Sequence, residues 1–265
     1  MAAGKDRGTA YVVEGGGPPV VLVHGMGLNR DMWNWQLPAL VPRFRVVRYD
    51  LVGHGESDPP ADGCSMDDLV RQLDRLLDHL QLDRCALVGF SLGGLIVRAY
   101  ALRHPHRVTA LAVLNSAHNR TEAERAAMRE RLERATRLGH VSTIDAALER
   151  WFTKGFAARH PEVLDRVRRW MEANDPAVYP KVYRVLAESD AALRTAISAI
   201  RCPTLVLACD EDHGNSPDMA RRMGALIPDA RTVILPGLRH MALAEHPEAV
   251  SEALVPFLEE TLGVK

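Results

Sequence analysis

The stretch LVGFSLGGLIVRA, from Leu87 to Ala99, joins an apolar strand-like run to a helix-like run through a serine set among glycines. Its centre, Gly89 to Gly93, reads GFSLG and fits the pattern G-x-S-x-G, which requires a strand before it and a helix after it. The serine backbone in such a turn is strained, and the glycines avoid collisions between a Cβ and nearby backbone. Ser91 is therefore either an exposed nucleophile or a small residue at a tight junction.

Short apolar and β-branched runs recur along the chain and predict strands. They are YVV from Tyr11, VVLVH from Val20, RVVRYD from Arg45, ALVGF from Ala86, ALAVLN from Ala110, TLVLAC from Thr204 and TVIL from Thr232. Most are apolar throughout, which is typical of parallel strands covered on both faces. Helical patterns lie between them. This alternation predicts an α/β protein with a mostly parallel β-sheet flanked by helices.

The alternation of strand and helix lapses in the middle of the chain, where helical patterns follow one another without a convincing strand. We therefore expect residues 119–199 to form an inserted all-helical cap. The α/β core then comprises residues 1–118 and 200–265. Within the cap, Thr121 and Glu124 predict a capping box at the start of a helix. A further helix is expected around Tyr179, broken near Pro180.

Length and composition limit the classes of function. The chain has 265 residues and a formal net charge of −1, so no global field attracts nucleic acid or acidic membranes. No segment approaches the run of about 18 apolar residues that a membrane span requires, and no apolar stretch of signal-peptide length is present. We expect a cytoplasmic protein whose partner is a small-molecule substrate. Composition leaves the oligomeric state undetermined.

Three more stretches carry a resemblance to a known family. They are HGMGLNRDMW from His24, YDLVGHGESD from Tyr49 and PGLRHMALAEHPEAV from Pro236. Together with GFSLG they occur in the order found in the α/β-hydrolase fold superfamily, and the chain resembles its serine-hydrolase branch with a helical cap. The resemblance implies a chain order of nucleophile, acid and histidine. It also favours the nucleophile interpretation of the serine.

The resemblance implies a role for each matching residue. Ser91 is the expected nucleophile and His240 the expected base, because a serine hydroxyl needs an imidazole to take its proton. The family pattern selects Asp212 as the acid that orients the imidazole. Asp210 stays an alternative, because Cys209 stands where glycine is usual in the family and the following loop is one residue longer.

Two backbone amides are expected to bind the oxyanion. By the family match, the first belongs to Met26, the residue after His-Gly, and the second to Leu92, the residue after the serine. Such a mechanism requires no metal and no organic cofactor, and we predict neither. The histidines of RHPHRV, at His104 and His106, lack further ligand residues nearby and do not indicate a metal site.

Substrate choice is expected to depend on the cap. The stretch ERWFTKGFAARHPE, from Glu149, resembles the cap of 3-oxoadipate enol-lactonases, which hydrolyse small carboxylated lactones or esters. The aromatic residues expected to wall the pocket are Trp151, Phe152 and Phe156. The basic residues available for a substrate carboxylate are Arg150, Lys154 and Arg159.

The sequence thus predicts a serine hydrolase that cleaves an ester or lactone bond of a small carboxylated substrate through an acyl-enzyme. A Ser-His-Asp triad serves equally for amide or N-formyl bonds, or for the carbon–carbon bonds of ring-degradation pathways, so these stay alternatives. A third alternative is a non-catalytic small-molecule receptor of the same fold.

Overall fold

The computed structural model describes residues 1–264, and its strands form one eight-stranded sheet with the order β1-β2-β4-β3-β5-β6-β7-β8. The strands are β1 (Ala2–Asp6), β2 (Thr9–Glu14), β3 (Pro19–Val23), β4 (Arg45–Tyr49), β5 (Cys85–Phe90), β6 (Val108–Leu114), β7 (Thr204–Cys209) and β8 (Ala230–Leu235). The pairs β1–β2 and β2–β4 are antiparallel, and all other pairs are parallel. The predicted mostly parallel sheet is therefore confirmed.

The strands that the sequence predicts are all present, and one strand was missed. Strand β1 has the sequence AAGKD, which lacks β-branched residues, and it lies at the exposed edge of the sheet. By contrast, every residue of the central strand β5 is buried. Apolar runs reveal strands that are covered on both faces, whereas an edge strand such as β1 forms by backbone pairing alone and leaves little signal.

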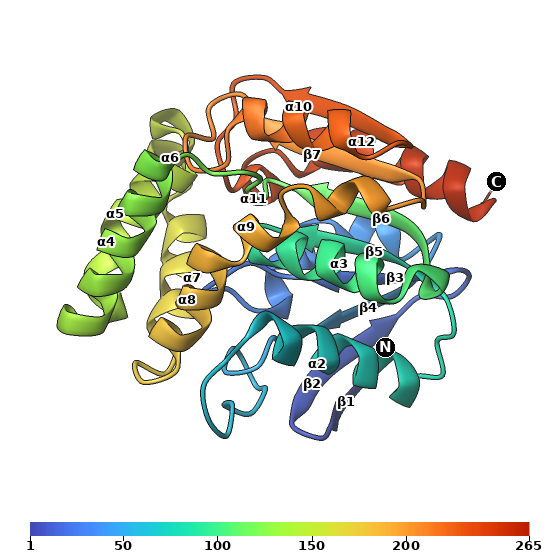
Figure 1. The fold of residues 1–265 in the computed structure, drawn as a ribbon, viewed down its shortest axis with the longest axis horizontal. Helices are drawn as coiled ribbons and strands as arrows, with labels where there is room; N and C mark the ends of the chain where they lie inside the picture. The colour runs from blue at the N-terminus through green and yellow to red at the C-terminus, as the bar shows by residue number, and fades with distance from the viewer. Residues whose placement is uncertain (265) are drawn as a thin grey trace.

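Helices cover both faces of this sheet (Figure 1). The α-helices are α1 (Leu37–Leu40), α2 (Met66–His79), α3 (Leu92–Arg103), α4 (Glu122–Leu138), α5 (Ile144–Trp151), α6 (Lys154–Arg159), α7 (Pro161–Glu172), α8 (Tyr179–Glu188), α9 (Asp190–Leu193), α10 (Pro217–Leu226), α11 (Ala242–Glu245) and α12 (Pro247–Leu262). Short 3-10 helices are η1 (Arg30–Trp35), η2 (Pro105–Arg107), η3 (His140–Thr143) and η4 (Ala196–Ala199).

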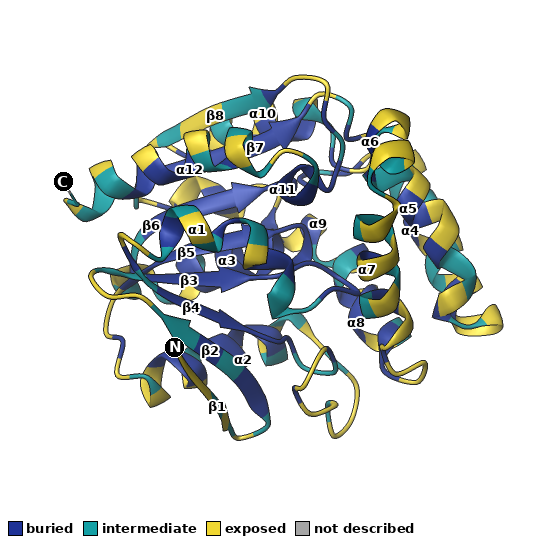
Figure 2. Ribbon diagram, turned by 180° about the vertical axis from the view of Figure 1, so that it is seen from behind, coloured by how far each residue is buried: buried dark blue, intermediate teal, exposed yellow. Residues whose placement is uncertain are grey.

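The hydrophobic core consists of two clusters, one on each face of the sheet. Alternate residues of one strand enter different clusters: Val21 of β3 belongs to the cluster that includes residues of α2, α3 and α10, whereas its neighbour Leu22 belongs to the cluster that includes residues of η1, α11 and α12. This is the two-residue period of a strand. Figure 2 shows the result, with the central strands buried and the outer helix surfaces exposed.

Between β6 and β7 the described chain forms helices only, α4 to α9 with η3 and η4. We call residues 119–199 the helical segment. Its helices α4 to α8 lie beside the sheet, at the side opposite the C-terminus (Figure 1). The predicted capping box of Thr121 and Glu124 is present at the start of α4. Pro180 does not break a helix as predicted, because it lies in the first turn of α8, where no amide hydrogen is needed.

Candidate active site

Ser91 lies at the junction of β5 and α3 in a conformation that serine rarely adopts. Its φ of 54° and ψ of −111° place it outside the usual regions for a residue with a side chain. Two contacts hold it there: its amide donates to the carbonyl of Leu114 (3.0 Å), and its carbonyl accepts from the hydroxyl of Ser116 (2.7 Å). Strain of this kind persists only where the surroundings enforce it and is concentrated at functional sites.

The glycines around Ser91 allow an unusually close backbone approach. A Cβ at Gly89 would lie 2.3 Å from the carbonyl oxygen of Gly93, and a Cβ at Gly93 would lie 2.1 Å from the carbonyl oxygen of Val23. Both distances are far below van der Waals contact, so neither position accepts a side chain. The glycines of GFSLG therefore let α3 turn back tightly against β5 and β3.

His240 follows β8 and faces Asp212 in the loop after β7. The two side chains are buried, and His240 Nδ1 lies 2.7 Å from Asp212 Oδ2. A carboxylate oxygen accepts, so Nδ1 carries the proton of the neutral ring and Nε2 is left as the acceptor. Asp210, the alternative acid, is directed elsewhere: its Oδ1 accepts from the amide of Gly237 (2.7 Å). The structure thus brings His240 together with Asp212.

The Asp212 carboxylate has further donors around it. Asn115 Nδ2 donates to Oδ2 (3.1 Å), and the amides of Gly214 and Asn215 donate to Oδ1 (3.0 Å each). Burial alone would raise the pKa of Asp212, but the attraction of His240 and these hydrogen bonds outweigh burial and lower it. The group is therefore ionised at neutral pH. Sequence reasoning missed Asn115, although its place directly after β6 was a signal.

The loop after β3, which carries Met26, is fixed by two buried histidines. The amide of Gly27 donates to His54 Nε2 (3.1 Å), and the amide of Leu51 donates to His24 Nε2 (2.9 Å). Burial lowers the pKa of His54 to about 3 and that of His24 to about 4, so both rings are neutral and can accept these bonds. Both rings thus hold the loops after β3 and β4, and neither forms a hydrogen bond with Asp212.

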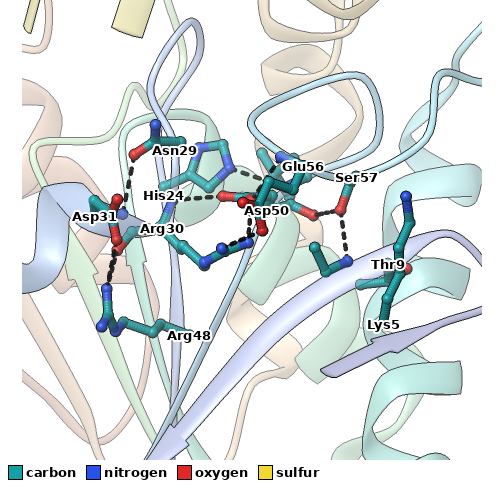
Figure 3. Close-up of polar contacts among 12 residues, drawn as sticks. Lys5, Thr9, His24, Asn29, Arg30, Asp31, Arg48, Asp50, Glu56 and Ser57 are labelled. Carbon is teal, nitrogen blue, oxygen red and sulfur yellow. Dashed lines mark hydrogen bonds and ion pairs between the residues drawn. The ribbon is translucent and has the colours of Figure 1, made fainter. Parts of the chain in front are cut away.

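A polar cluster ties the same loop to the loop after β4 (Figure 3). Asp50 accepts from the backbone amide of Arg30 (2.7 Å) and from the amide of Glu56 (3.0 Å). The Arg30 guanidinium forms ion pairs with both Asp50 and Glu56. Because Asp50 is buried, these bonds stabilise one arrangement of the two loops.

The amides of Met26 and Leu92 are both available for a ligand. In the part of the chain that the structure describes, neither amide donates a hydrogen bond to a protein group. Leu92 is the first residue of α3, where amides have no partner within the helix and the helix dipole favours negative charge. Both amides are therefore unbonded donors, as the predicted oxyanion hole would require.

A cavity of about 90 Å³ opens beside these residues. Ser91, His240 and Met26 line it from the sheet side, and Trp151 of α5 lies over His240 with ring centroids 5.6 Å apart. Residues of the helical segment complete the wall; among them are Arg120, Arg131, Arg150, Tyr179 and Tyr183. The cavity thus joins the candidate reactive groups to basic side chains.

Two predicted pocket residues are not on this wall. Phe152 and Phe156 stack on each other, with ring centroids 5.6 Å apart and nearly parallel planes, and both are buried in the core. The cavity wall does not include them, because Phe152, the residue after α5, and Phe156 are both buried among other apolar side chains. Lys154 and Arg159, two of the three basic residues considered for a carboxylate, are likewise absent from the wall.

Residues 1–264 contain neither a cluster of metal-ligand side chains nor a helix suited to cross a membrane. No group of three or more histidine, cysteine, aspartate or glutamate side chains is arranged to hold a metal ion there. In the same residues, no helix combines the length and the apolar character needed to cross a membrane.

The family can now be stated. A model of the alpha/beta hydrolase fold family matches residues 18–247, so the chain belongs to this family. The eight-stranded sheet and the position of Ser91 after β5 agree with that assignment.

Several similar proteins are hydrolases by name. The (E)-2-((N-methylformamido)methylene)succinate hydrolase of Acinetobacter baylyi is 31% identical over 97% of this chain and 96% of its own. An enol-lactonase structure from Burkholderia xenovorans has a TM-score of 0.89 and 31% identity, covering 97% of this chain and 99% of its own. A malate-bound esterase from Thermogutta terrifontis has a TM-score of 0.87 and 30% identity, covering 96% and 93%. The predicted likeness to enol-lactonases is confirmed.

Proposed function

We propose that this protein is a serine hydrolase that cleaves an ester or lactone bond of a small carboxylated substrate through an acyl-enzyme. The observation that carries the proposal is the arrangement around one cavity: a strained serine, a histidine bonded to a buried carboxylate, and two free amides. The helical segment acts in this proposal as a cap that selects the substrate. The partner is a small molecule rather than nucleic acid or a membrane surface.

These residues can carry out the reaction with water as the only other reagent. His240 Nε2 takes the proton of Ser91 Oγ while that oxygen attacks the substrate carbonyl, and the amides of Met26 and Leu92 hold the oxyanion. His240 then returns the proton to the leaving oxygen. Water, deprotonated by His240, attacks the acyl-enzyme and releases the acid. Asp212, ionised because its pKa is lowered, stabilises the imidazolium in both steps.

A carboxylated substrate is supported by the charge of the cavity and by the relatives. The cavity wall holds three arginines from the helical segment, and its volume of about 90 Å³ suits a small molecule. Two similar proteins are associated with small dicarboxylic acids. One is named for a succinate derivative, and the structure of the other is described as malate-bound. An anionic ligand is the simplest common feature.

One specific observation favours a second candidate, the cleavage of an amide or N-formyl bond. The Acinetobacter baylyi relative acts, by its name, on an N-methylformamido compound, and it is 31% identical to this chain. The same triad can attack either carbonyl, so the substrate panel below includes a formamide.

Labelling and a substrate panel test the proposal. A serine-directed fluorophosphonate should label the protein, and Ser91→Ala should abolish the adduct and lower kcat by at least about 10³-fold. Among substrates, carboxylated esters and lactones should be preferred over neutral alkyl esters and over formamides. An adduct that survives in Ser91→Ala, or efficient turnover of neutral esters alone, would overturn it.

A further inference from the structure

The three arginines on the cavity wall differ in their partners. Arg120 is buried and paired: its Nη1 lies 3.3 Å from Asp190 Oδ1, and it also donates to the carbonyl of Leu186 (2.9 Å). Its backbone amide donates to Asp190 as well (2.9 Å). The charge of Arg120 is thus already neutralised by a buried carboxylate, and this residue serves the packing of the segment.

Arg131 has no such partner. Its Nε donates to the hydroxyl of Tyr183 (3.3 Å) and its Nη2 to the thioether of Met128 (2.9 Å), and neither acceptor carries a charge. Among residues 1–264, no carboxylate lies within 4.0 Å of this guanidinium. The guanidinium has five donors in a planar fork, so most of its donors are left for a ligand.

Arg150 is the second arginine without a partner. It is partly buried on the cavity wall, and no hydrogen bond or ion pair joins its guanidinium to another described residue. Burial lowers its pKa, and the charge of Arg131, which lines the same cavity, lowers it further. Two partly desolvated like charges destabilise one another, and a shared anion relieves this cost.

We propose that Arg131 of α4 and Arg150 of α5 together form the subsite that binds a carboxylate of the substrate, one guanidinium to each side of it. The assignment deepens the proposed function, because it says which residues select an acidic substrate in the cavity of Ser91. A guanidinium pair matches the planar, two-oxygen geometry of a carboxylate. Tyr183 holds Arg131 in place through its hydroxyl.

Binding to the intact chain tests the subsite without turnover. In the Ser91→Ala protein, succinate is titrated calorimetrically, with neutral succinamide as the comparison. Succinate should bind, and Arg131→Gln or Arg150→Gln should each weaken it by about 10- to 100-fold, the loss expected for a charge-assisted pair. Arg134→Gln is the matched control, since Arg134 lies exposed on the same helix as Arg131 and forms no ion pair with a described residue.

Kinetics of two matched esters give a second readout. Monomethyl succinate keeps one carboxylate and dimethyl succinate has none, so the ratio of their kcat/KM values reports the subsite. Arg131→Gln and Arg150→Gln should lower kcat/KM for the monoester by about 10- to 100-fold and leave the diester unchanged. Equal losses for both esters would indicate misfolding of the segment and would overturn the assignment.

The outcomes separate the subsite from the proposed reaction. Absence of succinate binding, unchanged binding in both arginine variants, or the same loss in Arg134→Gln would overturn the subsite. Failure of fluorophosphonate to label Ser91, with arginine-dependent succinate binding intact, would instead remove the serine mechanism and keep the subsite.

Discussion

The turn around Ser91 and the helical segment that faces it differ in the groups that form them: backbone atoms in the turn and long charged side chains in the segment. The turn is held by backbone contacts: carbonyls and amides of neighbouring strands fix Ser91, and its glycines lie against backbone oxygens. The segment presents long charged side chains, of which some are paired, as Arg120 is, and some are free, as Arg150 is. The turn therefore tolerates almost no substitution, whereas side chains of the helical segment can be replaced one at a time.

This difference places the proposed reaction and the proposed substrate selectivity in different parts of the molecule. Backbone contacts fix the position of Ser91, and in the proposed reaction its attack is indifferent to the rest of the substrate. In the proposed complex, Arg131 and Arg150 contact a carboxylate distant from the reacting bond. Changes in the turn should therefore abolish activity or folding, and changes in the segment should change which substrate is used.

The largest contrast is expected between two aspartates of one loop. Asp212→Asn should lower kcat by about 10³- to 10⁴-fold, because the amide cannot stabilise the His240 imidazolium and the ring loses its fixed tautomer. Asp210→Asn should change kcat less than threefold, since its side chain only accepts from the amide of Gly237. Steady-state kinetics of both variants check this. A reversal of the two effects would refute the assignment of the acid.

A matched pair of glycine variants compares the two regions directly. Gly93→Ala should lower the free energy of unfolding by about 3 kcal/mol or more, because the new Cβ would meet the carbonyl oxygen of Val23 at 2.1 Å. Gly155→Ala, in α6, should raise the free energy of unfolding by up to about 1 kcal/mol, since no atom lies within 4 Å of the new Cβ and alanine favours the helix.

Urea unfolding of the two glycine variants provides the measurement. Gly93→Ala should also lose fluorophosphonate labelling, whereas Gly155→Ala should keep it. Similar stabilities for the two variants would show that the turn can relax, against the backbone-built description of the site.

The smallest expected effect is a pH dependence of the free energy of unfolding. It arises from buried histidines in the core and not from the exposed helices. His118 is buried, has no hydrogen-bond partner among the described residues, and burial lowers its pKa to about 4 from about 6.5 when unfolded. As the pH falls below 6.5, the unfolded chain takes up this proton first, so stability is lost toward pH 4. His24 and His54 act with the same sign.

Removing one of these histidines should make the protein less sensitive to acid. His118→Leu should reduce the pH dependence of the free energy of unfolding by about 1 kcal/mol per pH unit between pH 6 and pH 4.5. His106→Leu, at an exposed position outside the core, serves as the control for the loss of an imidazole. Equal slopes in wild type and His118→Leu, by urea titration at each pH, would contradict the assignment.

Much of the fold and of the candidate site followed from local patterns. The strands predicted from apolar runs are present, and the turn at Ser91 could be recognised from five residues because its geometry demands glycine at fixed places. The side chains of the helical segment that line the cavity were harder to predict. Phe152 and Trp151 are adjacent in the chain and pack on the same apolar cluster, yet only Trp151 lines the cavity, because Phe152 is fully covered by its neighbours.

The sequence by itself determined the mostly parallel α/β sheet and the strand–serine–helix turn, because each depends on residues close together in the chain. Only the tertiary structure decided between Asp210 and Asp212, which lie two positions apart and point to different partners. It alone also brought Arg131 and Arg150 to one wall and paired Arg120 with Asp190. The charge of the cavity wall depends on which arginines are paired with carboxylates from distant parts of the chain. No local sequence pattern indicates that pairing.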